Sequence, residues 1–280
     1  MSADIGFEDI TVDYVSIAAA RAMGGLRLVL GAYAIPGPWR ESCKALFDVK
    51  RIAYTSVRCS NAGASETSFG AEGSHSELIE WTAQSSAPVA VWQDERPRAS
   101  WIDQLNLAER LAPEPRLIPE DFETRLRMFG LINEIAGENG LGWSKRLILV
   151  DQALNNAEPG SADYVFWQTL GQKYLFTPQA GQAAKARMIE ILVKLDTELA
   201  ASRARGSRYF IGDSLSALDI YAACFYALLE PLAPELCPMA SSYRPAYRNA
   251  DPDIESHMTV ALREHRDFIY GQHLVLPIVF

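Results

Sequence analysis

A serine that opens a predicted helix is the residue best placed for chemistry in this sequence. Ser100 precedes Ile102, Leu105 and Leu111, which repeat at helical spacing, so Ser100 takes the N-cap position. The hydroxyl of an N-cap serine and the first backbone N–H groups of its helix can together bind an anion. Arg40, in the first turn of a second predicted helix, could also hold an anionic ligand. An anionic ligand would suit both positions, although a cation in the first turn of a helix opposes the helix dipole, and a helix cap alone would also explain Ser100.

A short strand and a tight turn must position that serine. Residues 89–92 read Val-Ala-Val-Trp, an apolar strand that the chain enters through Pro88. Residues 94–95 form a plausible turn. Pro97 lacks a backbone N–H, so a second strand after the turn should lie at a sheet edge. The pattern predicts a strand, a hairpin turn and then the helix capped by Ser100.

A β-helix-β unit precedes this region. Residues 26–30 and 52–57 are apolar strands, and residues 39–50 have the spacing of a helix between them. A connection of this kind joins parallel strands, as at the start of a thioredoxin-like fold. Residues 1–24 are interpreted as an N-terminal extension that contains a short helix.

The second half of the chain is predicted to be helical throughout. From residue 120 the apolar residues repeat at helical intervals, after a linker at residues 117–119. Ser216 and Asp219 have the spacing of a capping box, which starts a helix. Residues 221–229 are apolar nearly all round, so this helix should be buried.

Composition limits the classes of partner. The chain has 280 residues and a net charge of −9, which argues against nucleic acid or an anionic membrane as the main partner.

The four cysteines form no C-x-x-C pair, and we expect them to be reduced in a cytoplasmic protein. Cys43 falls on the buried face of its helix and is interpreted as structural. His257 and His265 are predicted at the surface, and no histidine has metal-ligand spacing, so we expect no metal.

These motifs together resemble the cytosolic glutathione transferase superfamily. The proline before the strand, the turn, the serine-capped helix and the later capping box are the parts similar to that family, over about residues 26–270. The resemblance implies an α/β thioredoxin-like domain followed by an all-α domain. The implied division is an extension at 1–24, a glutathione-binding domain at 25–113 and a helical domain at 117–280.

The resemblance also implies where glutathione would bind. The Ala87–Pro88 bond would be cis, and the backbone of Val89 would pair with the cysteinyl part of glutathione. Ser100 would hold the γ-glutamyl carboxylate, and Asp103 or a residue of a partner chain would lie near the amine. Ala99 stands where the family usually has an acidic residue.

Thiol activation requires a hydrogen-bond donor or a helix N-terminus near the sulfur. In the family that donor is a tyrosine, a serine or a cysteine, and Tyr33 stands where the tyrosine classes hold theirs. Gly37 replaces the residue of the cysteine classes. Tyr33 is therefore the predicted catalytic residue, and Trp39 and Arg40 are predicted to contact glutathione. Ser42 and the amides at the start of the 39–50 helix are the alternative donors, and Tyr33 or Trp39 could instead serve only in packing.

Two functions remain open. The first is a transferase that adds the glutathione thiolate to a small electrophilic or hydrophobic substrate. The second is a protein of the same fold that binds a ligand or a partner without turnover. The resemblance further implies a homodimer, for which Trp101 and Phe122 would suit the interface.

Overall fold

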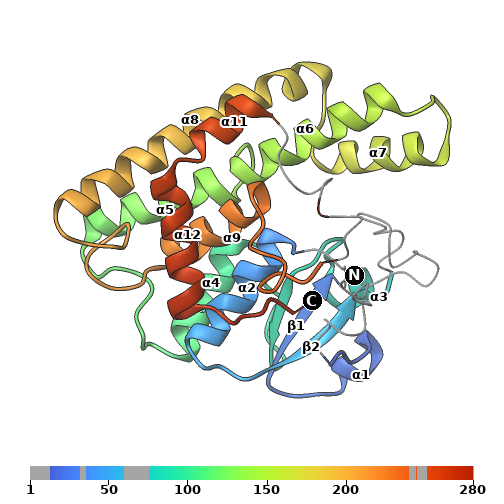
Figure 1. Ribbon diagram of the computed structural model, residues 1–280. Coiled ribbons are helices and arrows are strands. Elements are labelled where there is room, and N and C mark those ends of the chain that lie inside the picture. Colours follow the sequence, from blue (N-terminus) through green and yellow to red (C-terminus); the bar gives the residue numbers. More distant parts are fainter. Residues whose placement is uncertain (1–12, 32–35, 60–75, 240–243, 245–250, 280) are drawn as a thin grey trace.

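The computed structural model describes residues 13–31, 36–59, 76–239, 244 and 251–279, which form a small sheet domain and a larger helical domain (Figure 1). The sheet domain contains α1 (Ile17–Arg21), β1 (Leu26–Gly31), α2 (Pro38–Val49), β2 (Tyr54–Cys59), α3 (Ser76–Thr82), β3 (Val89–Trp92) and α4 (Trp101–Leu111). The helical domain contains α5 (Phe122–Ala136), α6 (Leu141–Asn156), α7 (Ala162–Lys173), α8 (Pro178–Ala204), α9 (Ala217–Leu229), α11 (Pro252–His257) and α12 (Val260–His273). No strand occurs in the described part of the helical domain.

The sheet has three strands in the order β2-β1-β3, with β2 parallel and β3 antiparallel to β1. The second strand of the predicted hairpin is reduced to a single bridge, in which Ala90 and Arg98 exchange backbone hydrogen bonds of 2.9 and 2.8 Å. Pro97 lacks a backbone N–H, so it cannot extend this bridge into a ladder. On the opposite edge, Val15 of the N-terminal extension bridges to Val57 of β2.

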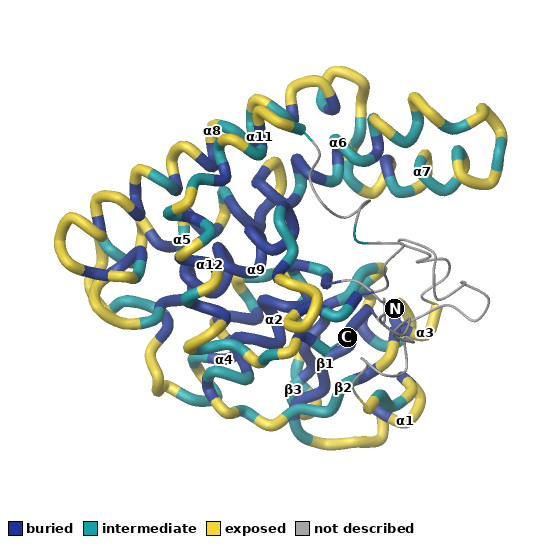
Figure 2. The backbone as a smooth tube through the Cα atoms, viewed as in Figure 1, coloured by how far each residue is buried: buried dark blue, intermediate teal, exposed yellow. Residues whose placement is uncertain are grey.

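Alternation along β1 separates two apolar clusters. Leu28 and Leu30 are fully buried against α2, α4 and the helical domain. Val29, which points to the other face, packs with Val57 of β2 and with residues of α1 and α3. The first cluster is continuous across both domains, as the dark blue core of Figure 2 shows.

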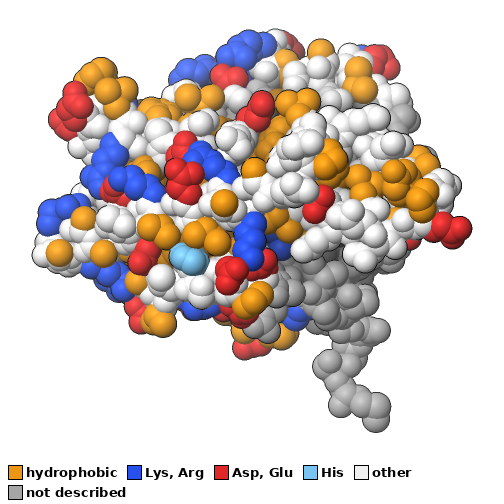
Figure 3. Space-filling view, turned by 90° about the horizontal axis from the view of Figure 1, so that it is seen from above, with side chains coloured by type: hydrophobic (Ala, Val, Ile, Leu, Met, Phe, Trp, Pro, Cys, Tyr) orange, Lys and Arg blue, Asp and Glu red, His pale blue; other side chains and the backbone are white. Residues whose placement is uncertain are grey.

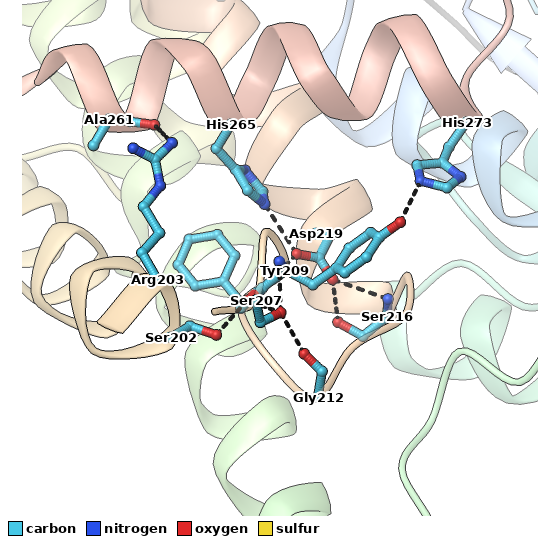
Figure 4. A network of polar contacts seen from close by, with 11 residues as sticks. Ser202, Arg203, Ser207, Tyr209, Gly212, Ser216, Asp219, Ala261, His265 and His273 are labelled. Carbon is cyan, nitrogen blue, oxygen red and sulfur yellow. Dashed lines mark hydrogen bonds and ion pairs between the residues drawn. The ribbon is translucent and has the colours of Figure 1, made fainter. Parts of the chain in front are cut away.

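Helix α9 is the centre of the helical domain, and all of its residues are buried. The predicted capping box is confirmed, because the Asp219 carboxylate accepts hydrogen bonds from the Ser216 N–H (2.9 Å) and hydroxyl (2.6 Å). The same carboxylate accepts from the Phe210 N–H at 2.8 Å and lies 2.9 Å from Nε2 of His265 (Figure 4). The surface prediction for His265 is therefore wrong: α12 turns this residue toward α9, where it is buried.

Trp101 joins the two domains. Its ring lies 5.8 Å from that of Tyr221, and its carbonyl oxygen accepts a 3.2 Å hydrogen bond from the Tyr221 hydroxyl. Trp101 is half-buried because α9 partly covers it, and its place in a dimer interface stays a prediction. Phe122, the other aromatic of that prediction, is 57% exposed at the start of α5.

Candidate functional site

A cleft of about 600 Å³ lies between the two domains, within the usual size range of small-molecule sites. The sheet domain lines one wall with residues from the end of β1, the start of α2, the approach to β3 and the start of α4. The helical domain lines the other wall with residues from the end of α5, from α6 and from the region around the end of α7. The described lining residues are Gly31, Gly37, Trp39, Arg40, Ser42, Gln84, Ser85, Ser86, Ala87, Pro88, Ala99, Ser100, Trp101, Gln104, Ala136, Glu138, Trp143, Arg146, Leu170, Lys173 and Tyr174.

The approach to β3 forms the edge of the first wall. The peptide bond between Ala87 and Pro88 is cis, as the resemblance implies. The side-chain amide of Gln104 donates to the Pro88 carbonyl at 3.0 Å and to the Arg98 carbonyl at 3.3 Å. Gln104 is buried and fixes this segment against α4. Sequence reasoning missed Gln104, although its place on the same helical face as the buried Ala108 was a usable signal.

Ser100 occupies the N-cap of α4, as predicted, and lines the cleft. Its hydroxyl oxygen accepts a 3.2 Å hydrogen bond from the Asp103 N–H, and its hydroxyl donates to the Asp103 carboxylate at 3.0 Å. A hydrogen bond from Arg96, at 3.1 Å, holds the pKa of Asp103 below its ordinary value. Asp103 itself does not line the cleft but stands behind Ser100.

Arg40 lines the cleft near the end of β1, and it is almost fully buried. Its Nε donates to the Glu41 carboxylate at 2.9 Å, and its Nη1 donates to the carbonyl of Gly31. Lys44 contacts the same carboxylate at 3.2 Å. Burial alone would raise the pKa of Glu41, but Lys44 and Arg40 outweigh burial and hold that pKa below its ordinary value. Arg40 is therefore fixed in place, with much of its charge balanced by Glu41.

Trp39 forms part of the floor of the cleft. Its indole N–H donates a 2.8 Å hydrogen bond to the carbonyl oxygen of Ala136 at the end of α5. Its ring packs edge-on against Phe225 of α9, with 5.0 Å between the ring centroids. Trp39 thus offers an apolar surface to a ligand while its N–H joins the two domains.

One predicted contact, Val89, is not brought to the cleft, and the predicted catalytic residue Tyr33 falls outside the described residues. Val89 is fully buried, and it does not line the cleft. Because Ala90 bonds Arg98 through both backbone groups, alternation turns the backbone groups of Val89 toward β1. Ala87 stands at the wall instead. Tyr33 lies outside the described residues, two positions after Gly31, whose backbone is at the cleft.

The wall from the helical domain was not predicted. Trp143 of α6 and Tyr174, just after α7, pack edge to face with their ring centroids 4.9 Å apart. Arg146, Lys173 and Leu170 continue this wall. The sequence predicts that this half of the chain is helical, but it gives no sign of which helix faces the sheet domain.

The cleft differs from the rest of the molecule in charge. The described lining carries Arg146 and Lys173, together with Arg40, whose charge Glu41 partly balances, and one carboxylate, that of Glu138. The whole chain has a net charge of −9, and on the face seen in Figure 3 acidic and basic side chains are interspersed. A cleft of this composition favours ligands that carry negative charge.

Other chemistry in the described part of the chain is limited. The Ser42 hydroxyl donates to the Trp39 carbonyl at 3.2 Å, and Cys43 is fully buried, which raises the pKa of its thiol. All four cysteines are free thiols and buried. The described residues contain no cluster of three or more His, Cys, Asp or Glu side chains that could hold a metal ion. Nor do they include a helix with the length and apolar character needed to span a membrane.

Comparison with known proteins gives a likeness in fold. No protein-family model matches the chain, and no curated protein matches it. Among solved structures, a glutathione S-transferase from Methylobacterium radiotolerans in complex with glutathione sulfonate is similar, with a TM-score of 0.56 and 14% identity. That match covers 88% of this chain and 91% of the other.

Two further solved structures are similar to this chain in fold. A glutathione S-transferase from Methylobacillus flagellatus with glutathione bound has a TM-score of 0.53 and 13% identity, over 86% of this chain and 98% of the other. The beta-etherase LigF from Sphingobium sp. strain SYK-6 has a TM-score of 0.52 and 15% identity, over 84% of this chain and 98% of the other. The chain therefore has the glutathione transferase fold, which confirms the predicted thioredoxin-like domain and the all-helical domain that follows it.

Proposed function

We propose that this protein binds glutathione in the interdomain cleft and transfers its thiolate to a small electrophilic molecule. The observation that carries the proposal is the cleft wall itself, which Pro88 and the α4 N-cap Ser100 both line in a glutathione transferase fold. Glutathione carries two carboxylates, which suits a cationic cleft and a helix N-terminus.

Glutathione would lie along the sheet-domain wall. Its γ-glutamyl carboxylate would bind the Ser100 hydroxyl and the first N–H groups of α4, with Asp103 behind them near the amine. Its cysteinyl backbone would lie along the Ala87–Pro88 segment, since Val89 is turned toward β1. The position of Arg40 supports a role in holding the rest of the peptide near the start of α2.

Tyr33 is the proposed donor to the thiolate. Its place in the sequence, two residues after Gly31 at the cleft, supports this role. The alternative donors are the first-turn amides of α2, because its N-cap Gly37 makes no side-chain capping bond. A helix N-terminus of this kind also lowers the pKa of a nearby thiol.

A thiol-conjugation assay with glutathione and 1-chloro-2,4-dinitrobenzene tests the proposal. The Tyr33→Phe variant should raise the pKa of bound glutathione by about one to two units, which is what a lost charge-assisted hydrogen bond is worth. Its rate at neutral pH should fall while its affinity for glutathione stays nearly unchanged. Full activity in Tyr33→Phe would assign activation to the α2 amides. Binding of glutathione without any turnover of electrophiles would instead support the binding-protein alternative.

We also propose a homodimer. Phe122 and Leu126, one turn apart on α5, are 57% and 52% exposed, and such an apolar pair suits a protein interface. The chain mass is 31.0 kDa, so light scattering should report twice that value. The Phe122→Glu variant should shift the mass toward the monomer. A wild-type monomer at micromolar concentration would contradict the proposal.

A further inference from the structure

The wall of the cleft that faces the glutathione wall combines aromatic rings with positive charge. Trp143 and Tyr174 form an edge-to-face pair, with ring centroids 4.9 Å apart. The Lys173 ammonium lies 5.8 Å from the centroid of the Tyr174 ring. Arg146 is one turn from Trp143 on α6 and lines the same cleft.

These residues lie on α6 and at the end of α7, and neither helix contributes to the wall that Ser100 and Pro88 line. α6 begins at Leu141, and its early residue Gly142 packs on Trp39 and Phe225, so this end of α6 is fixed to the floor of the cleft. α7 packs along α6 and ends at Lys173 (Figure 1). The aromatic pair is therefore held by both helices, across the cleft from the proposed glutathione wall.

A buried lysine stands next to Arg146 in α6, although it does not line the cleft. Burial together with the Arg146 charge lowers the pKa of Lys145 to about 8, against the opposing effect of Asp251. At neutral pH Lys145 therefore retains most of its charge. The carboxylate of Glu138, which is exposed, is the single acidic side chain among the described lining residues. A neutral apolar substrate would gain nothing from the charges of Arg146 and Lys173, whereas an anionic substrate would.

We propose that the second substrate of this enzyme is an aromatic electrophile that carries an acidic group, held by the wall of Trp143, Arg146, Lys173 and Tyr174. The aromatic body would stack against Trp143 and Tyr174, as rings prefer offset or edge contacts. The acidic group would lie toward Arg146 and Lys173, which can donate charge-assisted hydrogen bonds. This inference rests on the proposed function, because it assigns the acceptor of the glutathione thiolate.

The reaction used to test it is a substitution on an aromatic ring. The glutathione sulfur forms a C–S bond at the ring carbon that bears chlorine, the C–Cl bond breaks, and chloride leaves with the bonding electron pair. The thiol proton passes to solvent. Two electrophiles undergo this same step: 4-chloro-3,5-dinitrobenzoate, which is anionic, and 1-chloro-2,4-dinitrobenzene, which is neutral.

The experiment compares KM for the two electrophiles in the wild type, in Lys173→Gln and in Arg146→Gln. Each variant should raise KM for the benzoate about tenfold, the worth of one charge-assisted contact, while KM for the neutral electrophile changes less than about twofold. Lys194→Gln is the matched control, since Lys194 is an exposed helix lysine outside the cleft and should alter neither value. Added salt should weaken the benzoate preference of the wild type.

Equal KM changes for both electrophiles would overturn the proposal. So would a rise in KM for glutathione alone, because the cations would then serve the peptide. A chain without any turnover would refute the proposed transferase function but leave this site testable through equilibrium dialysis of unreactive 3,5-dinitrobenzoate and 1,3-dinitrobenzene. Tighter binding of the benzoate, lost in Lys173→Gln, would then support an acidic-aromatic site, and equal binding would refute it.

Discussion

The indole N–H of Trp39 donates a 2.8 Å hydrogen bond to the carbonyl oxygen of Ala136, and this bond ties the start of α2 to the end of α5. Both residues line the cleft, so the contact that joins the domains is also part of the site. The edge contact of Trp39 with Phe225 fixes the same ring against α9. The width of the cleft therefore depends on how α2 packs on the helical domain.

Replacing Trp39 by Phe should destabilise the protein by about 1–3 kcal/mol, because the buried Ala136 carbonyl loses its donor. Urea denaturation measures the change in the free energy of unfolding. Trp143→Phe is the control, because it makes the same substitution at a cleft-lining indole for which no hydrogen bond is seen among the described residues. It should lower the free energy of unfolding by less than Trp39→Phe does. Equal losses in the two variants would show that ring size, and not the hydrogen bond, matters.

Gly142 should not tolerate alanine. A Cβ at this position would lie 2.8 Å from the Trp39 ring and closer still to the ring of Phe225. We expect Gly142→Ala to lower the free energy of unfolding by about 1–3 kcal/mol, the usual cost of overpacking a core. Gly130→Ala in α5 is the control, since no atom lies within 4 Å of its added Cβ. That control should raise stability by about 0.5–1 kcal/mol, because alanine is the better helix former. A tolerated Gly142→Ala would contradict the packing of α6 on Trp39.

Asp219 should be the most sensitive acid in the helical domain. Its buried carboxylate contacts Ser216 twice, the Phe210 N–H and the His265 ring (Figure 4). Asparagine has a single acceptor oxygen, and its NH₂ group would face hydrogen-bond donors at the second position. Asp219→Asn should therefore lower the free energy of unfolding by about 3 kcal/mol. Asp121→Asn at the exposed N-cap of α5 should change stability by less than about 0.5 kcal/mol, because Asn also caps helices. Thermal or urea unfolding of both variants decides the comparison.

The lowered pKa of Lys145 predicts that the free energy of unfolding rises with pH. Burial and Arg146 lower its folded-state pKa from 10.5 to about 8. Between these two pKa values the unfolded chain binds more protons than the folded one, so the free energy of unfolding increases as pH rises through this window. From about pH 7 to about pH 9 the wild type should gain roughly 1 kcal/mol relative to Lys145→Met. An unchanged difference between the two proteins at both pH values would refute the lowered pKa.

The sequence predicted those elements whose local chemistry is complete within a few residues. The strand at 89–92, the Ser100 cap and the box of Ser216 and Asp219 each depend on neighbours in the chain, and the structure contains all three. The sheet-domain wall of the cleft could be predicted from the strand and the Ser100 cap, because the Ala87–Pro88 segment and Ser100 are close in sequence.

What could not be predicted depends on contacts between distant segments. His265 meets Asp219 across 46 positions of sequence, and helical spacing alone does not reveal which face of α12 is buried. The aromatic pair of Trp143 and Tyr174 becomes part of a site only when α6 and α7 pack across from the sheet domain. Val89 was predicted to contact the ligand, but strand alternation, fixed by the bridge of Ala90 to Arg98, turns it away.

Titration of the protein with glutathione in a calorimeter tests the central claim most directly. The wild type should bind glutathione, Ser100→Ala should bind about tenfold more weakly, and Ser16→Ala should bind as the wild type does. Ser16 is the matched control, because it caps α1 with the same 3.1–3.2 Å contact that Ser100 makes but lies outside the cleft. A wild type that does not bind glutathione, or a Ser100→Ala variant with unchanged affinity, would contradict the assignment of this cleft.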